Sequence, residues 1–264
     1  MATDKYTKYI GDENSIKWAQ ASRYIYLNKI LKINKLIHAI DIGDFNLSKF
    51  LVLEYKYNVD VKDNHIPAIF LSLSKNVEIF KLLLLNNANL CPKIDGDTIL
   101  IKIVRKNDLE LLEFVLEHRR ADIDIDFQDA NGNTAFMIAC KNNFTEIAEI
   151  LIENGAEIDI KNKDKNTALM ISCEKGYIEI TNMLLERANL TCVNNIGDTA
   201  LHRASRFQNI EIIQLLMKAM SIETIQHKNI FDKTALEVWN IIEININPEI
   251  EKLDIFKDLL KREN

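Results

Sequence analysis

The most constraining feature of this chain is a segment that recurs about every 33 residues. The copies beginning at Thr134, Thr167 and Thr199 read Thr-Ala-Phe-Met-Ile-Ala-Cys, Thr-Ala-Leu-Met-Ile-Ser-Cys and Thr-Ala-Leu-His-Arg-Ala-Ser, and they are separated by 33 and 32 residues. A unit of this length cannot bury its apolar face alone, so such units stack and bury it against their neighbours. The period therefore predicts an array of stacked units, which points to binding as the task of the chain.

Following the Thr position along the chain extends the array to seven repeats. The position is occupied by Asn34, Pro67, Thr98, Thr134, Thr167, Thr199 and Thr234, at intervals of 31 to 36 residues. In each repeat a turn precedes this position and a short helix follows it. A Gly or Asn that tolerates the left-handed conformation is then expected to close that helix, at Gly43, Asn76, Asn107, Asn143 and Gly176.

A second, longer helix is predicted in each repeat by apolar residues at helical spacing. Ile147, Ile150 and Leu151 in one repeat match Ile180, Met183 and Leu184 in the next. The third repeat is three residues longer than the fourth. We interpret the extra residues as a longer finger or loop after Leu116.

These patterns resemble the ankyrin repeat from about residue 32 to residue 243. The matching segments are Asp-Ala-Asn-Gly-Asn-Thr-Ala-Phe at 129–136, Asn-Gly-Ala-Glu-Ile-Asp at 154–159 and Gly-Asp-Thr-Ala-Leu-His-Arg-Ala at 197–204. The resemblance implies an all-α solenoid of about seven helix-turn-helix units with projecting β-turn fingers, stacked into a curved slab. It also implies that His202 bonds the turn and fixes the helix start. The second repeat departs from the family pattern, because it lacks the usual Gly and Thr.

The ends of the chain are predicted to cap the array, since terminal repeats need a polar outer face. We expect an N-terminal tail and capping helix in residues 1–31, with the helix at 15–31, repeats over 32–243, and a C-terminal capping helix in 244–264. In the last segment Pro248 suits the first turn of a helix.

Composition narrows the class of protein. Of the 264 residues 47% are hydrophobic and 27% charged, which is ordinary for an ordered, soluble chain. The net charge of −6 argues against a dedicated nucleic-acid binder. The sequence shows neither a secretory signal nor an apolar run long enough to span a membrane. We expect a cytoplasmic monomer, or a protein of the host cytosol if it is an effector delivered into another cell.

The sequence predicts no enzyme, cofactor or metal site. Its His residues lack ligand spacing, and no nucleophile elbow or phosphate loop is present. The run Asp122-Ile-Asp-Ile-Asp imitates the start of a calcium loop, but Phe127 replaces the required Gly and Asn133 the bidentate Glu. Cys140 and Cys173 occupy equivalent positions that favour a small buried side chain, too far apart for a disulfide.

The resemblance places partner contacts at the ends of the first helices and in the fingers. The helix-end pairs are Ser74-Lys75, Arg105-Lys106, Lys141-Asn142, Glu174-Lys175 and Arg206-Phe207, with six cations against one anion. The outer face of the second helices is acidic, with Glu110, Glu113, Glu117, Glu146, Glu149, Glu153, Glu179 and Glu186. We therefore expect a basic ridge in a concave groove that binds an acidic segment of another protein, anchored by Arg105 and Arg206.

Two alternatives accompany this hypothesis. Cations at helix ends also complement the helix dipole, without any partner. A nucleic acid along the ridge would give steeply salt-dependent binding, but the ridge lacks the clustered aromatic residues that stack on bases.

The fingers complete the predicted contact set. The partner-binding residues are Lys75, Arg105, Lys106, Lys141, Asn142, Lys175, Arg206 and Phe207 at helix ends, with Asn131, Asn133, Asp164, Asn166, Ile196, Asp198 and Phe231 in the fingers. Three apolar residues stand at positions that are expected to face solvent: Ile196, Phe207 and Phe231. They either contact a partner or pack against the neighbouring finger.

Overall fold

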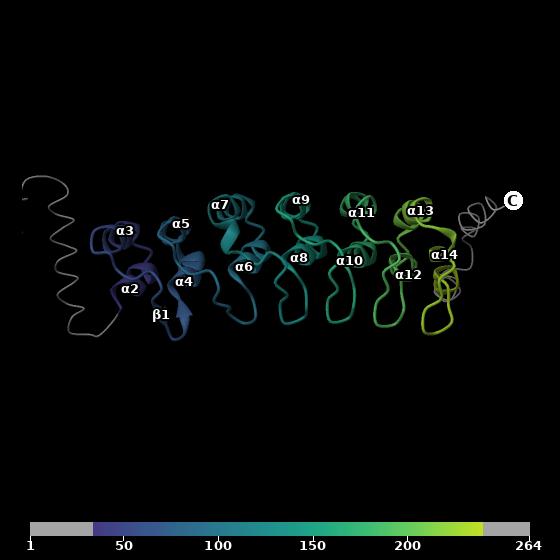
Figure 1. Ribbon diagram of the computed structural model, residues 1–264, viewed down its shortest axis with the longest axis horizontal. Helices are drawn as coiled ribbons and strands as arrows, with labels where there is room; N and C mark the ends of the chain where they lie inside the picture. Colours follow the sequence, from purple (N-terminus) through teal and green to yellow (C-terminus); the bar gives the residue numbers. More distant parts are fainter. Residues whose placement is uncertain (1–33, 240–264) are drawn as a thin grey trace, which may run out of the picture. The chain divides into compact units, whose positions relative to one another are not determined.

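A computed structural model of the chain describes residues 34–239 (Figure 1). The predicted capping helices at 15–31 and 248–260 lie outside the described residues. The chain divides into two compact units, Met1–Ile94 and Asp95–Asn264. Each unit is described by itself below.

The first unit holds two helix pairs. Its elements are α2 (Lys35–Asp41), α3 (Phe45–Leu53), β1 (Lys62–Asp63), β2 (Ile66–Pro67), α4 (Ala68–Lys75) and α5 (Val77–Leu85). The first helices α2 and α4 pack against each other, as do the second helices α3 and α5. The two short strands pair antiparallel, with Lys62 opposite Pro67 and Asp63 opposite Ile66, and form the finger of the second repeat.

The second unit continues the same pattern. Its elements are α6 (Ile99–Arg105), α7 (Leu109–Arg119), the 3₁₀ turn η2 (Arg120–Asp122), α8 (Ala135–Asn142), α9 (Thr145–Glu153), α10 (Ala168–Lys175), α11 (Ile178–Leu185), α12 (Ala200–Arg206), α13 (Ile210–Ala219) and α14 (Ile222–Ile225). Residues 235–239 are also helical. The first helices α6, α8, α10 and α12 pack in sequence order, and α7 packs against α9 and α11 against α13. The predicted all-α repeat architecture is confirmed.

The recurring Thr starts each first helix of the second unit. The hydroxyl groups of Thr98, Thr134, Thr167 and Thr199 each accept a hydrogen bond from the backbone N–H three residues later, at 3.2 to 3.5 Å. This contact satisfies one of the backbone donors that a helix start leaves open, and it stabilises a helix by about 1 kcal/mol. The repeat period is thus a period of N-caps.

Most of the predicted helix ends are confirmed. Gly43, Asn107, Asn143 and Gly176 have φ values of 70°, 56°, 60° and 76°, in the left-handed region. The prediction for Asn76 is wrong, because its φ is −158°. Its side-chain oxygen instead accepts the backbone N–H groups of Glu78 and Ile79 and caps the start of α5.

The extra residues of the third repeat do not form the predicted loop after Leu116. The second helix α7 continues to Arg119 and ends in the turn η2. Arg120 then donates from Nε and Nη2 to the backbone oxygen of Asn154, at 3.0 and 2.7 Å. The insertion therefore lengthens a helix and ties the third repeat to the fourth.

The predicted inward faces are largely confirmed. Ile147, Leu151, Ile180 and Leu184 are 0 to 1% exposed, while Ile150 and Met183 are half-buried. Cys140 and Cys173 are also buried. Burial raises the pKa of the Cys173 thiol to about 12, so this side chain stays neutral and packs as a small apolar group.

Candidate binding face

Each finger of the fourth to seventh repeats is closed by the residue five positions before the capping Thr. This residue is Asp129, Asn162, Asn194 or Asn229. Its Oδ1 accepts the backbone N–H groups two and four residues later at 2.8 to 3.3 Å, as in the bonds from Ile196 and Asp198 to Asn194. A short polar side chain therefore fixes the shape of the turn.

Three of these residues also link their finger to the preceding one. The Nδ2 groups of Asn162, Asn194 and Asn229 donate to Oδ1 of Asn133, Asn166 and Asp198, at 3.0, 3.0 and 2.8 Å. Backbone bonds run beside them, from the N–H groups of Lys163, Asn195 and Ile230 to the carbonyl oxygens of Asn131, Asp164 and Ile196. We call this set of side-chain bonds the amide ladder.

The amide ladder is interrupted between the third and fourth repeats, where Asp129 stands in place of an Asn. A carboxylate cannot donate to Asp97, and two carboxylates side by side repel each other. Arg105 lies between them: its Nε is 3.0 Å from Asp97 Oδ2, and its Nη2 is 2.7 Å from Asp129 Oδ2. The side chains of Asp97 and Asp129 are only 9% and 3% exposed. The guanidinium group therefore bridges two nearly buried carboxylates, and Lys102 supplies a second cation to Asp97 at 3.3 Å.

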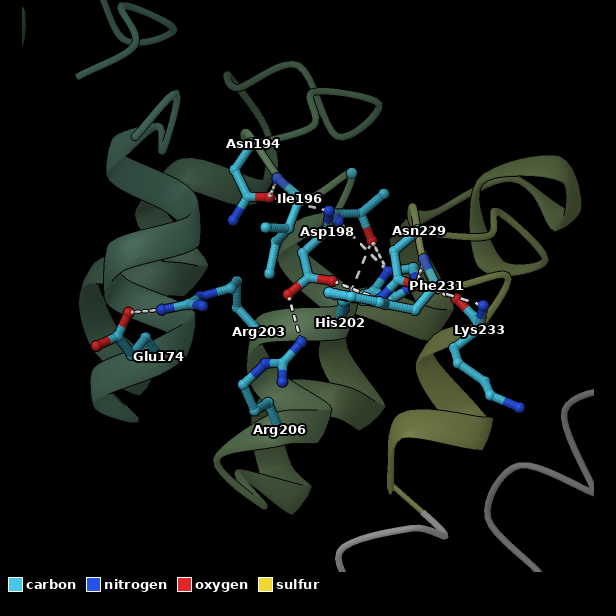
Figure 2. A network of polar contacts seen from close by, with 12 residues as sticks. Glu174, Asn194, Ile196, Asp198, His202, Arg203, Arg206, Asn229, Phe231 and Lys233 are labelled. Atoms are coloured by element: carbon cyan, nitrogen blue, oxygen red, sulfur yellow. Dashed lines mark hydrogen bonds and ion pairs between the residues drawn. The ribbon is translucent and has the colours of Figure 1, made fainter. Parts of the chain in front are cut away.

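A related network joins the sixth and seventh repeats (Figure 2). Arg206 Nη2 donates to Asp198 Oδ2 at 2.9 Å, and the other oxygen of Asp198 accepts the amide of Asn229. Arg203 pairs with Glu174 of the preceding repeat (Figure 2). Its guanidinium carbon also lies 5.3 Å from the ring centroid of Phe207. These arginines are held by groups of their own chain.

His202 has the structural role that its motif implies. Its Nδ1 accepts the backbone N–H of Thr199 at 3.3 Å, and its Nε2 lies 3.0 Å from the carbonyl oxygen of Lys233 in the seventh finger. Burial is the main cause that lowers the pKa of this imidazole. Nearby, His227 Nε2 contacts the carbonyl oxygen of Gly197 at 3.1 Å. The two histidines tie adjacent fingers together.

The predicted helix-end residues lie where the sequence places them. Lys75, Lys106, Lys141, Asn142, Lys175 and Phe207 are exposed at or next to the C-terminal ends of α4, α6, α8, α10 and α12. Lys75 pairs with Asp41 at 3.6 Å, and Lys175 lies 3.9 Å from Glu174. The eight glutamates of the second helices are likewise all exposed.

The fingers divide into exposed and buried residues. Asn131, Asp164 and Phe231 are exposed, whereas Asn166 and Ile196 are half-buried. Phe207 and Phe231 are 46% and 62% exposed, so neither is covered by a neighbouring finger.

Two parts of the predicted contact set need correction. Asp198 and Asn133 are 0% and 8% exposed, because the amide ladder uses them as acceptors. They are therefore unavailable to a partner. Arg105 and Arg206 are not free anchors, since each already binds a carboxylate of its own chain.

Lys163 and Lys165 are two exposed cations that the predicted contact set does not include. Both are exposed in the fifth finger, on either side of Asp164. The visible signal was the alternation of Lys and polar residues over 161–165, and Lys165 stands where the fourth and sixth fingers have Gly.

Residues 34–239 contain neither of two other kinds of site, a metal site formed by three or more such ligands or a membrane-spanning helix. Within this range no group of three or more His, Cys, Asp and Glu side chains is arranged to hold a metal ion. None of the helices described there has the length and hydropathy needed to cross a membrane.

Stacked helix pairs joined by hydrogen-bonded fingers define a helical repeat protein. A family model described as ankyrin repeats matches residues 68–162 and 154–229, which is more than half of the chain. The chain therefore belongs to the ankyrin repeat family. Ankyrin repeats generally mediate protein–protein interaction.

Two curated relatives share the repeats. The chain is 34% identical over 90 residues to the human transient receptor potential cation channel subfamily A member 1, covering 33% of this chain and 8% of the channel. It is 30% identical over 201 residues to alpha-latrotoxin-Lg1a of Latrodectus geometricus, covering 74% of this chain and 12% of the toxin. The matches thus span a small part of either relative.

A solved structure shares the fold. The ankyrin repeat domain of Bcl-3, described as a unique member of the IkappaB protein family, superposes with a TM-score of 0.69 over 80% of this chain and 98% of that domain. The identity is 20%, so this likeness concerns the fold alone.

Proposed function

We propose that this chain is a non-catalytic adaptor that binds another protein through its helix-end face. This face consists of the C-terminal ends of the first helices of the second unit and the exposed finger residues beside them. The amide ladder supports the proposal, because it holds the fingers of the second unit in place before any partner arrives. A preordered surface loses less conformational entropy on binding.

The observation that carries the proposal is a separation of charge in the third to fifth repeats. The helix-end face bears the exposed cations Lys106, Lys141 and Lys175 there, while the second helices of the same repeats expose glutamates. Such a distribution steers a negatively charged partner towards one face and repels it from the other. An acidic segment of a partner protein is the ligand that fits this face.

Affinity capture followed by mass spectrometry tests the proposal. The charge-reversal variant Lys106→Glu, Lys141→Glu, Lys175→Glu is expected to lose partners that the wild type retains. Arg105 and Arg206 stay unchanged, because they bind carboxylates of the chain itself. The lysate is treated with nuclease beforehand, so that captured proteins are not bridged by nucleic acid.

The matched control reverses three exposed cations on or next to second helices. The control variant is Lys49→Glu, Arg187→Glu, Lys218→Glu, with the same change in net charge. Lys49 lies in α3, Arg187 in the segment after α11, and Lys218 in α13. The control is expected to capture the same partners as wild type. Equal capture by all three proteins would contradict the helix-end face as the binding surface.

A further inference from the structure

One helix-end cation differs from its counterparts in the other repeats. The position seven residues after the capping Thr holds Arg105, Lys141, Glu174 and Arg206 in the third to sixth repeats. Both arginines bind buried carboxylates, and Glu174 pairs with Arg203 and Lys175. The Lys141 side chain forms no hydrogen bond or ion pair within residues 34–239 and is exposed.

The amide ladder explains why Lys141 has no internal partner. Arg105 reaches the residue before its own capping Thr and the turn-closing residue of the next finger. In the fourth repeat these two positions are Asn133 and Asn162, which are uncharged and bonded to each other at 3.0 Å. The two carboxylates that Arg105 binds thus have no counterparts in the fourth repeat, where Lys141 occupies the equivalent position.

The adjoining fifth finger adds two further cations. Lys163 and Lys165 are exposed, and neither side chain has a bonded partner in the described part of the chain. The fifth finger adjoins the fourth through the bond from Lys163 N–H to the carbonyl oxygen of Asn131 at 3.1 Å. Unpaired positive charge thus collects over the fourth and fifth repeats.

The backbone of Lys165 is a second, independent observation. Its φ is 58°, in a position where the third, fourth and sixth fingers have Gly96, Gly132 and Gly197 with φ of 83°, 77° and 72°. A side chain in this conformation is strained relative to Gly. The second and seventh fingers also have side chains there, His65 at φ 73° and Asp232, and Asp232 pairs with Lys228. Lys165 carries the strain without an internal contact, which favours a role towards a ligand.

We propose that Lys141, Lys163 and Lys165 form the docking point for the carboxylates of an acidic protein segment. We call these three residues the lysine cluster. The inference rests on the proposed function and narrows it to the fourth and fifth repeats. Arg105 serves instead to hold two neighbouring fingers together, and Arg206 pairs with Asp198 of its own repeat.

The observations favour a protein ligand over a nucleic acid. The fourth and fifth fingers, residues 129–133 and 162–166, contain no aromatic side chain on which a base stacks. The net charge of −6 also repels a polyanion at longer range, whereas a short acidic segment meets mainly the local cations.

Fluorescence anisotropy with a fluorescein-labelled peptide of alternating Glu and Ala tests the lysine cluster directly. The variant Lys141→Gln, Lys163→Gln, Lys165→Gly is expected to bind this peptide about tenfold more weakly than wild type at low salt. The control is Lys49→Gln, Lys56→Gly, Lys218→Gln, in which Lys56 is another lysine at positive φ, 52°. The control is expected to retain the wild-type affinity, and thermal unfolding verifies that both variants fold.

A third variant separates failure of this inference from failure of the proposed function. Lys106→Gln, Lys175→Gln removes the other two helix-end lysines of the second unit and is expected to leave affinity nearly unchanged. If this variant loses affinity while the lysine-cluster variant keeps it, the docking point lies elsewhere on the same face and only the inference is overturned. If wild type does not bind the peptide at all, both the inference and the acidic partner are overturned.

A labelled single-stranded oligonucleotide is titrated in parallel. Wild type is expected to bind it more weakly than the peptide. Tighter binding of the oligonucleotide that disappears in the lysine-cluster variant would assign these residues to phosphate contacts and overturn the inference.

Discussion

Arg105 Nη2 lies 2.7 Å from Oδ2 of Asp129, which belongs to the next repeat. The same guanidinium group also binds Asp97, so one side chain joins two nearly buried carboxylates from neighbouring fingers. At the next three junctions an Asn amide makes the connection directly. Arg105 is therefore the local replacement for a missing amide donor.

Removing this arginine should expose the repulsion between the two carboxylates. We expect Arg105→Met to lower the free energy of unfolding by about 2 kcal/mol, because Asp97 and Asp129 lose their shared donor. Asp129→Asn in the same background restores an amide and should recover most of the loss. Urea unfolding of the double-mutant cycle measures this coupling, and strictly additive effects would contradict the bridging role.

Close packing between the fourth and fifth fingers gives a second prediction. A Cβ at Gly132 would lie 2.8 Å from the backbone nitrogen of Lys163, whereas one at Gly155 would meet nothing nearer than 3.8 Å. Both residues have positive φ, 77° and 85°. We expect Gly155→Ala to cost about 1 kcal/mol from backbone strain, and Gly132→Ala clearly more. Equal melting temperatures of the two variants would contradict the observed spacing of the fingers.

Stability should depend on pH through His202. The unfolded imidazole takes up a proton near its ordinary pKa of 6.5, whereas burial lowers the pKa of the folded one. The stabilising contribution is therefore complete above pH 6.5 and is lost as pH falls below it, at up to about 1.4 kcal/mol per pH unit. Protonation would also put a hydrogen on Nδ1, where the Thr199 N–H donates.

Urea unfolding at neutral and mildly acidic pH measures this effect. His202→Gln should be less stable than wild type at neutral pH but lose less stability on acidification. The control His118→Gln changes an exposed histidine of α7 and should keep the wild-type pH dependence. The same loss on acidification in wild type and His202→Gln would refute the assignment to His202.

The second helices provide a prediction about the core. Leu151 and Leu184 are both 0% exposed, in α9 and α11. Truncation of either to Ala should cost roughly 2–5 kcal/mol in unfolding free energy, from lost burial and the cavity left behind. Chemical denaturation that shows either variant to be as stable as the parent would contradict the inward orientation of these leucines.

Much of the repeat architecture could be predicted from the sequence because its determinants are local. A Thr that caps a helix, or an Asn at positive φ that ends one, leaves the same signature in every repeat. The prediction for Asn76 is wrong because Asn suits both a left-handed helix end and an N-cap. Only the φ of the residue distinguishes the two roles. Arg120 shows the same limit, since its bond to Asn154 in the next repeat turns an expected loop into a helix end.

The candidate binding face was harder to predict, because charge alone does not reveal an internal partner. Arg105 and Lys141 occupy equivalent positions, yet the carboxylates that Arg105 binds, Asp97 and Asp129, are replaced by Asn133 and Asn162 one repeat later. Whether such a cation is paired depends on two residues in successive fingers. The sequence pattern of a single repeat does not show which residues lie together there. This difference in pairing changes the expected order of the cations, because Arg105 and Arg206, the predicted anchors, already bind carboxylates of their own chain.

Site-specific photo-crosslinking tests the central claim most directly. Benzoylphenylalanine is placed either at Asn131, exposed in the fourth finger beside the lysine cluster, or at Glu149, exposed on α9. The proposed helix-end face predicts that a captured partner crosslinks from position 131 and not from position 149. Crosslinks from position 149 alone would show that the partner binds the acidic side of the second helices and would contradict the account.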